Sequence, residues 1–193
     1  MILSLVAIFC VSIFLIALFW GISVRNSIVE YENRVKRSWS DVLVYEQRKN
    51  IVISKLEDIV KDFKNYESDF HSKIVELRNS QKSLLKKDDD INFDEFSNVQ
   101  KKSDDLLNSI KVTVEDYPEL KSDAVFVNLM TETVEQQDNI SSAIRIFNNN
   151  VEMFNTNIKV FPNNIINENF NKKSEFNLFK TDEKSDIGFD PKL

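Results

Sequence analysis

Residues 2–24 read ILSLVAIFCVSIFLIALFWGISV and contain no charged side chain. At about 1.5 Å per residue, a helix over this stretch is about 34 Å long, enough for a hydrocarbon core about 30 Å thick. Trp20 lies near one end of the stretch, where indole rings prefer the membrane interface. The stretch therefore predicts a transmembrane anchor over residues 1–24. The residues predicted to span the membrane include Ile2, Phe9, Phe14, Trp20 and Val24.

A cleaved signal peptide is the competing interpretation of the same stretch. Such a peptide begins with a basic segment, followed by a shorter apolar run and a cleavage site between small residues. Here no Lys or Arg precedes the run, and the run is too long. A lipoprotein signal is also disfavoured, because the bulky Phe9 directly precedes Cys10. The sequence therefore favours a retained anchor and a single-pass membrane protein.

The basic residues that follow the apolar stretch determine its predicted orientation. They are Arg25, Arg34, Lys36 and Arg37. Because Lys and Arg near a span favour the cytoplasmic side, the domain after it is predicted to be cytoplasmic and the N-terminus outside. The same four side chains are candidates for contact with anionic lipid headgroups. A topology signal without lipid contact is the simpler interpretation, since Glu30 and Glu32 dilute the charge.

A second pattern, late in the chain, predicts a helix with one apolar seam. Its residues recur with alternating steps of four and three, the 3.5-residue period of helices packed in bundles or coiled coils. They are Phe126, Met130, Thr133, Gln137, Ile140, Ile144, Phe147, Val151, Phe154, Ile158 and Phe161. Ser122 or Asp123 can cap the start of this helix, and Pro162 sets its end.

An earlier seam follows the anchor directly. Its members are Ile28, Tyr31, Val35, Trp39, Val42, Val52, Leu56, Ile59, Phe63, Tyr66, Phe70, Ile74, Leu77 and Leu84. No Gly or Pro interrupts residues 23–87, so the anchor can continue as one very long helix. The pattern loosens between Tyr45 and Ser54, where the sequence allows either a bend or a continuous helix.

A third helix is predicted between the polar breaks KKDDD at residues 86–90 and DYPELK at residues 116–121. Each helix must bury an apolar stripe, and short connectors make neighbouring helices antiparallel. The predicted fold class is therefore all-α, an antiparallel up-down bundle of three or four long helices over residues 25–162. The predicted core seam includes Trp39, Phe126, Ile140, Phe147, Phe154 and Phe161. Residues 163–193 show no steady period and are predicted to form a flexible polar tail.

The composition argues against most catalytic and ligand-binding chemistry. With 2 Gly and 3 Pro, sheet-rich folds and glycine-rich phosphate loops are disfavoured. A net charge of −6 argues against nucleic acid as a partner. One histidine, His71, and one cysteine, Cys10, cannot supply a zinc site or a Cys–His catalytic pair. Residues 88–94, DDDINFD, resemble a calcium loop, but Phe93 stands where glycine is needed. We therefore expect no enzymatic activity, no metal and no cofactor.

Three blocks of the sequence resemble the LemA family of bacterial membrane proteins. They are YENRVKRSWSDV at residues 31–42, YPELKSD at residues 117–123, and the segment 140–162 with its RIFN, FNT and FP steps. The first block is similar to a family segment that carries Asn, Val and Arg and runs into Ala-Trp-Ser. The second is similar to the family's Pro-Glu-Leu-Lys-Ala connector, and the third to its last helix, which is followed by Phe-Pro. The resemblance covers roughly residues 1–166. It departs at Ser54, where the family commonly has Pro, and at Asp62, where it often has Gly.

The resemblance implies an anchored three- or four-helix bundle in the bacterial inner membrane, without established enzymatic activity. Some relatives are linked to the formation of organelle-like membranes, and others are encoded near membrane metalloproteases. Two hypotheses about function stay open. The first is a membrane-anchored scaffold or adaptor that recruits a protein partner. The second is a self-associating, membrane-shaping protein. The expected partners are the lipid bilayer, an unidentified membrane or cytoplasmic protein and, in the second case, further copies of the chain.

Overall fold

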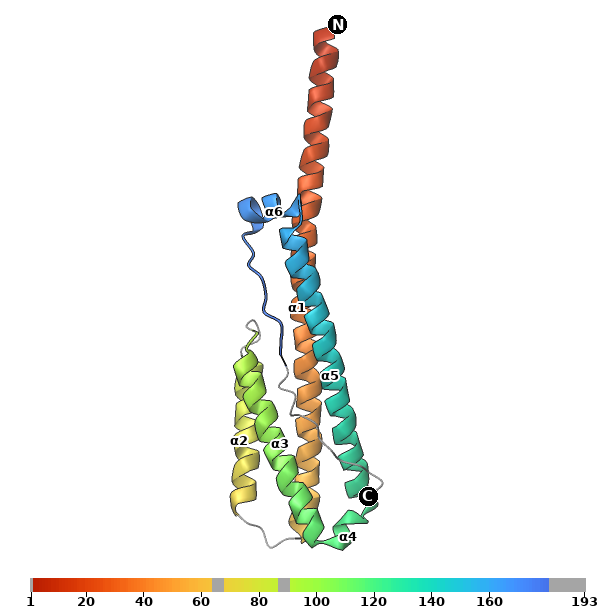
Figure 1. The fold of residues 1–193 in the computed structure, drawn as a ribbon, viewed down its shortest axis with the longest axis vertical. Coiled ribbons are helices and arrows are strands. Elements are labelled where there is room, and N and C mark those ends of the chain that lie inside the picture. The colour runs from red at the N-terminus through yellow and green to blue at the C-terminus, as the bar shows by residue number, and fades with distance from the viewer. Residues whose placement is uncertain (1, 64–67, 87–90, 181–193) are drawn as a thin grey trace. The chain divides into compact units, whose positions relative to one another are not determined.

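The computed structural model describes residues 2–63, 68–86 and 91–180, and every regular element in this part is helical (Figure 1). The all-α prediction is confirmed. The elements are α1 (Ile2–Phe63), α2 (Ser68–Lys86), α3 (Phe93–Asp116), α4 (Pro118–Lys121), α5 (Ala124–Lys159), α6 (Asn163–Ile166) and the π-helical turn η1 (Asn167–Asn171).

Helix α1 is one uninterrupted helix of 62 residues. The helix is not broken between Tyr45 and Ser54, where the sequence pattern loosens. Between Gly21 and Pro118 the chain has no glycine or proline, so no residue removes a backbone donor or relaxes the helical dihedral angles. The apolar pattern loosens for another reason, because the buried face of α1 carries Glu46 and Lys49 in this region.

The chain divides into two compact units. Unit 1 comprises Met1–Ser38 and Ile146–Leu178, and unit 2 comprises Trp39–Arg145 and Phe179–Leu193. Because the boundaries fall within α1 and within α5, each of these two helices contributes one segment to each unit.

In unit 2, helices α2 and α3 form an antiparallel pair (Figure 1). Two hydrogen bonds define their register. Lys73 Nζ donates to Ser109 Oγ at 3.5 Å, and Lys102 Nζ donates to Ser80 Oγ at 2.8 Å. Because residue numbers rise along α2 as they fall along α3, the two helices run in opposite directions. This is the arrangement that the short connector between them predicts.

An aromatic cluster forms part of the core of unit 2. Trp39 of α1 packs edge-on against Phe93 and Phe96 of α3, with ring centroids 5.4 and 5.3 Å apart. Phe179 packs against the same two phenylalanine rings, at 5.4 Å from each. Edge-to-face contacts set the positive rim of one ring against the negative face of another. The buried aliphatic residues of this unit include Val42, Ile53, Leu56, Leu106, Leu107, Ile110 and Ile140.

Helix α5 begins and ends where the sequence predicts. Of the two candidate caps, Asp123 performs this role, and its Oδ1 accepts hydrogen bonds from the backbone N–H groups of Val125 and Phe126 at 2.9 and 2.8 Å. The helix ends at Lys159, shortly before Pro162.

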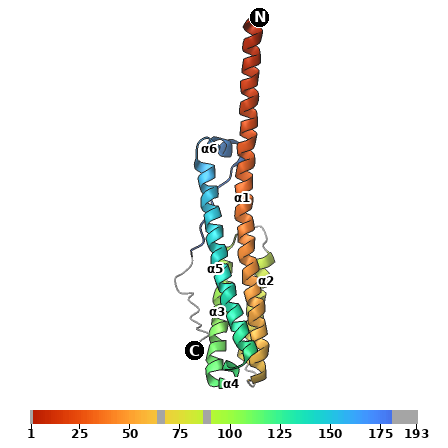
Figure 2. The same ribbon diagram turned by 90° about the vertical axis from the view of Figure 1, so that its right-hand side faces the viewer.

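In unit 1, segments of α1 and α5 lie side by side (Figure 2). The two apolar seams meet there, and their central members are fully buried: Ile28, Val35, Phe147, Val151 and Phe154. Phe161 is an exception, because it is 79% exposed although the seam predicts it in the core. Since α5 ends at Lys159, Phe161 lies beyond the last helical turn, and the helical period no longer sets its direction.

Residues 163–180 are structured where the sequence predicts a flexible tail. After α6 and η1, the chain continues as an extended segment. Asn155 of α5 holds this segment, since its Nδ2 donates to Phe176 O at 2.9 Å and its Oδ1 accepts from Phe176 N at 3.0 Å. Asn167 makes the same pair of bonds with the backbone of Lys173. Side-chain amides thus satisfy backbone groups that have no helical partner. The rest of the predicted tail, residues 181–193, lies outside the described residues.

Candidate functional site

The N-terminal part of α1 leaves its apolar side chains uncovered. Ile2 is 77% exposed, Phe9 and Phe14 are each 66% exposed, and Trp20 is 47% exposed. None of the residues in the most apolar 18-residue window of α1 is buried. Helix α1 is therefore long and apolar enough to cross a membrane. Val24, the last residue of the predicted span, is only 8% exposed, so the uncovered stretch ends just before it.

The four basic residues proposed for headgroup contact lie on exposed faces of α1. They are Arg25, Arg34, Lys36 and Arg37. Arg34 Nη2 donates to Glu30 Oε1 at 2.6 Å, and this hydrogen bond raises the pKa of Arg34. Lys36 Nζ lies 3.6 Å from Glu32 Oε1. These helical ion pairs reduce the net charge that Arg34 and Lys36 present.

Unit 2 contains a buried polar layer that the sequence analysis missed. Lys49 of α1 is 0% exposed and Glu46 is 1% exposed. Lys49 Nζ lies 3.4 Å from Glu46 Oε1 and donates to Gln137 Oε1 of α5 at 3.1 Å. Asn50 Nδ2 also donates to Glu46 Oε1, at 3.3 Å. Buried charges are tolerated when they are paired and hydrogen-bonded, and these contacts supply that pairing.

Burial controls the protonation of the two carboxyl groups in this layer. Desolvation raises the pKa of Glu46, and the nearby charge of Lys49 opposes the increase. Desolvation also raises the pKa of Asp104 on α3, again opposed by Lys49. The charge of Asp104 raises the pKa of Glu46 further. Two carboxyl groups from two helices therefore share one ammonium group, and the layer favours binding a proton.

The spacing of the sequence carried a signal for this layer. Alternating steps of four and three from Val42 to Leu56 pass through Glu46 and Lys49, so both residues occupy seam positions. Between Tyr45 and Ser54 the pattern loses hydrophobicity but keeps its register. Polar residues also fill seam positions on the facing helices, at Ser103, Thr133 and Gln137.

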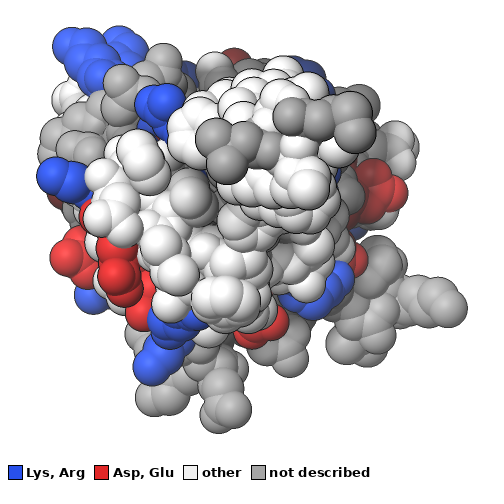
Figure 3. Space-filling model, turned by 90° about the horizontal axis from the view of Figure 1, so that it is seen from above, with Lys and Arg blue, Asp and Glu red and all other residues white. Residues whose placement is uncertain are grey.

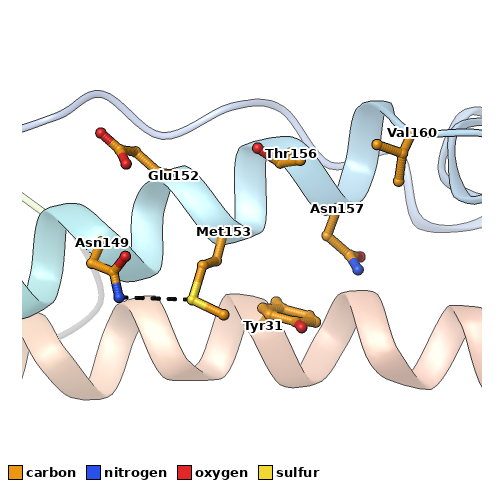
Figure 4. Close-up of a pocket in the computed structure, with 7 residues that line it drawn as sticks. All are labelled: Tyr31, Asn149, Glu152, Met153, Thr156, Asn157 and Val160. Carbon is orange, nitrogen blue, oxygen red and sulfur yellow. Dashed lines mark hydrogen bonds between the residues drawn. The ribbon is translucent and has the colours of Figure 1, made fainter.

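A groove of about 410 Å³ lies in unit 1 between α1 and α5 (Figure 4). Tyr31 lines it from α1, and the guanidinium group of Arg34 lies 5.2 Å from the centre of the Tyr31 ring. The side of α5 is lined by Asn149, Glu152, Met153, Thr156, Asn157 and Val160. Methionine is common at adaptable binding surfaces because its thioether is flexible and polarizable. The lining thus combines a thioether and an aromatic ring with several polar side chains.

Within the described residues, no group of three or more His, Cys, Asp or Glu side chains is placed to hold a metal ion. Cys10 is exposed on the apolar part of α1. The side chain of His71 and residues 88–90 of the calcium-loop resemblance lie outside the described part. The expected lack of metal, cofactor and catalysis stays a prediction.

These observations define a class: an all-helical protein whose first helix begins with an uncovered apolar stretch and continues unbroken into helical units. The model of the LemA family matches residues 38–191, and the chain belongs to this family. The resemblance inferred from the three sequence blocks is confirmed.

One relative is Protein LemA of Metamycoplasma hominis, which is 28% identical over 126 residues. The match covers 64% of this chain and 54% of that protein. The chain thus spans about half the length of the curated relative it matches.

Proposed function

We propose that this chain is a membrane-anchored helical scaffold or adaptor protein without catalytic activity. The observation that carries the proposal is the exposed apolar stretch of α1, in which an 18-residue window contains no buried residue. In water such a surface promotes aggregation, whereas a bilayer removes it from water and leaves its helical backbone satisfied. The anchor then fixes the location of the helical units, and their surface recruits a protein partner.

The proposed location is the bacterial inner membrane, with the N-terminus outside and the helical units in the cytoplasm. The basic residues from Arg25 to Arg37 support this orientation. A thiol-labelling experiment tests it in the Cys10→Ser background, with Glu152→Cys placed on an exposed position of α5. A membrane-impermeant maleimide should label Glu152→Cys only after the cells are broken. Labelling in intact cells would reverse the orientation.

Partner recruitment is tested with a photocrosslinking amino acid at Met153, which is 39% exposed and lines the groove beside Tyr31. Val125 is the matched control, because it is 59% exposed on the same helix and does not line the groove. We expect a discrete protein adduct from Met153 and none from Val125 when native membranes are irradiated. Lipid adducts alone at both positions would contradict the adaptor role.

Self-association with membrane shaping is the second candidate function. Helix α1 exposes Val44 and Ile51, at 44% and 51%, and these residues are one heptad apart. Residues at this spacing share a helix face, and another copy of the chain could pack against it. In a Cys10→Ser background, Ile51→Cys should form a disulfide-linked dimer on oxidation in the membrane if this alternative holds. A monomer under these conditions favours the adaptor.

A further inference from the structure

We infer that the segment from Phe161 to Phe170 is a second membrane contact, which lies on an anionic bilayer surface beside the point where α1 leaves the lipid. The inference rests on the proposed anchoring of α1. It adds a membrane-facing role for a segment that the sequence predicts to be a flexible tail.

The placement of α6 and η1 is the first argument. The Ile166 Cδ1 atom lies 3.8 Å from the position that a Cβ atom on Gly21 would take. Asn171 Nδ2 donates to the backbone oxygen of Arg25 at 3.2 Å. Gly21 and Arg25 lie on either side of Val24, the last residue of the uncharged stretch. Figures 1 and 2 both show α6 beside α1. The segment therefore lies at the level where the proposed anchor meets the membrane surface.

The polarity of the segment is the second argument. Phe161 is 79% exposed, Phe170 is 65% exposed and Ile165 is 47% exposed, whereas the polar residue Asn167 is only 8% exposed. The Asn167 side chain thus faces the protein, while three large apolar side chains face outward beside the exposed polar residues Glu168 and Asn169. In water this arrangement is unfavourable, but it suits a segment that lies in the boundary between headgroups and acyl chains.

Charge near the segment is the third argument. Arg25 and Lys172 are exposed at this end of unit 1, and Glu168 is the exposed acidic residue within the segment. Viewed from the end where α1 begins, the central surface is uncharged, and charged residues of both signs appear further out (Figure 3). Arg25 and Lys172 beside the exposed apolar side chains suit a bilayer with anionic headgroups, because each nearby Lys or Arg is attracted to the negative surface.

Depth measurements with spin labels test the inference in the full-length chain. The Cys10→Ser protein is placed in vesicles of phosphatidylcholine and phosphatidylglycerol, and a nitroxide is attached in turn to Phe14→Cys, Phe170→Cys and Glu152→Cys. Oxygen concentrates in lipid and a nickel chelate stays in water, so the ratio of their relaxation effects reports depth. We expect the label at position 14 to be deep, that at 170 to lie at headgroup depth, and that at 152 to be in water.

The three labels separate this inference from the proposal on which it rests. If the label at 14 is deep but the label at 170 is as accessible to nickel as the one at 152, the surface contact is overturned while the anchor stands. If the label at 14 is in water, the proposed anchoring fails, and the surface contact fails with it. A label at 170 that neither reagent reaches would indicate a protein in place of lipid and would also overturn the inference.

A second variant tests whether the aromatic rings hold the segment at the surface. The double substitution Phe161→Ser and Phe170→Ser is combined with a label at Ile165→Cys. We expect a several-fold fall in the oxygen-to-nickel ratio at position 165, since the segment loses its apolar contacts with lipid. Asn177→Ser, an exposed polar position of the extended segment, is the control and should leave the ratio unchanged. An unchanged ratio in the double variant would overturn the role of the rings.

Discussion

At the scale of single residues, Lys49 is a charged residue in a fully buried position. Its side chain is fully buried, 3.4 Å from a carboxylate oxygen of Glu46 and 3.1 Å from the amide oxygen of Gln137. Transferring a charged group from water to the protein interior costs roughly several kcal/mol of free energy unless polar partners replace the lost hydration. The partners of Lys49 come from α1 and α5, and the carboxylate of Asp104 on α3 also attracts it. The fold therefore depends on these groups remaining together.

Replacing Lys49 alone tests this dependence. We expect Lys49→Met to reduce the free energy of unfolding by about 3–5 kcal/mol, because it leaves the Glu46 carboxyl buried without its cation. The double variant Glu46→Leu with Lys49→Met should be more stable than Lys49→Met, since neither charge is then buried. Urea unfolding in mild detergent, followed by circular dichroism, measures both. A Lys49→Met protein as stable as the wild type would contradict the pairing.

The raised pKa of Glu46 predicts a pH dependence of stability. In the unfolded chain the Glu46 carboxyl has its ordinary pKa, about 4.5, and in the fold burial raises it. The stabilising effect of proton binding is complete below that ordinary pKa and is lost as the pH rises through the raised pKa. Asp104 acts in the same direction, while Lys49 opposes both shifts.

We therefore expect the urea midpoint of the wild type to fall as the pH rises from about 4.5 towards neutrality. Glu46→Gln should reduce this slope, because the amide does not titrate. Glu135→Gln, on an exposed position of α5, is the matched control and should keep the slope of the wild type. Equal slopes for Glu46→Gln and the wild type would show that Glu46 does not cause the dependence.

At the scale of elements, polar residues at seam positions determine how the helices pair. Hydrogen bonds from asparagine side chains determine how the extended segment attaches. A polar group at a core position of a helical bundle favours the register in which it finds its partner. In unit 2 the hydrogen bond from Lys49 to Gln137 fits only one register of α1 against α5. In unit 1 the Asn155 amide holds the backbone of Phe176 through two hydrogen bonds.

The two hydrogen bonds between Asn155 and Phe176 can be tested by substitution. Asn155→Ala removes both hydrogen bonds to Phe176 and should destabilise the attachment of residues 172–178 by about 1–3 kcal/mol. Hydrogen–deuterium exchange of this segment should become faster. Asn149→Ala is the matched control on the same helix, because the Asn149 amide contacts the Met153 sulfur at 3.8 Å and no backbone group of the segment. Unchanged exchange in Asn155→Ala would indicate that the segment is held by other contacts.

At the scale of the whole molecule, the uncovered apolar stretch of α1 is continuous with the helix that supplies core residues to unit 1 and unit 2. An uninterrupted helix does not hinge easily, because each residue is fixed by its backbone hydrogen bonds. Helix α1 is thus unbroken from the apolar stretch to Phe63.

A charge placed in the anchor tests its insertion. Phe14→Arg places a guanidinium group near the middle of the stretch, which should make insertion less favourable by about 2.5–3.5 kcal/mol. We expect a smaller membrane-bound fraction after carbonate extraction. Val29→Arg, on a 41% exposed position of α1 beyond the anchor, should leave this fraction unchanged. If Phe14→Arg and Val29→Arg behave alike, the stretch does not cross the bilayer.

Local patterns in the sequence were sufficient for the helices and for the core seam. The steps of four and three identified Phe126, Ile140, Phe147 and Phe154 as buried, and all four are 2% exposed or less. The lack of Gly and Pro from residue 23 to residue 87 agrees with an unbroken α1. Such patterns work because helix formation and amphipathicity depend on residues only three or four positions apart.

Only the tertiary structure decided which polar residues are buried and where the C-terminal residues lie. Lys49 and Gln137 are separated by 88 positions, and no local pattern shows that the two would meet in a buried layer. Phe161 follows the helical period in the sequence but lies beyond the end of α5 and is exposed. The sequence after Pro162 shows no hydrophobic period. Hydrogen bonds of the Asn155 and Asn167 side-chain amides hold this segment in place. The sequence by itself thus determined the elements and the apolar anchor stretch. The long-range contacts, which depend on how the chain folds in space, decided which polar groups are buried and where the last described segment lies.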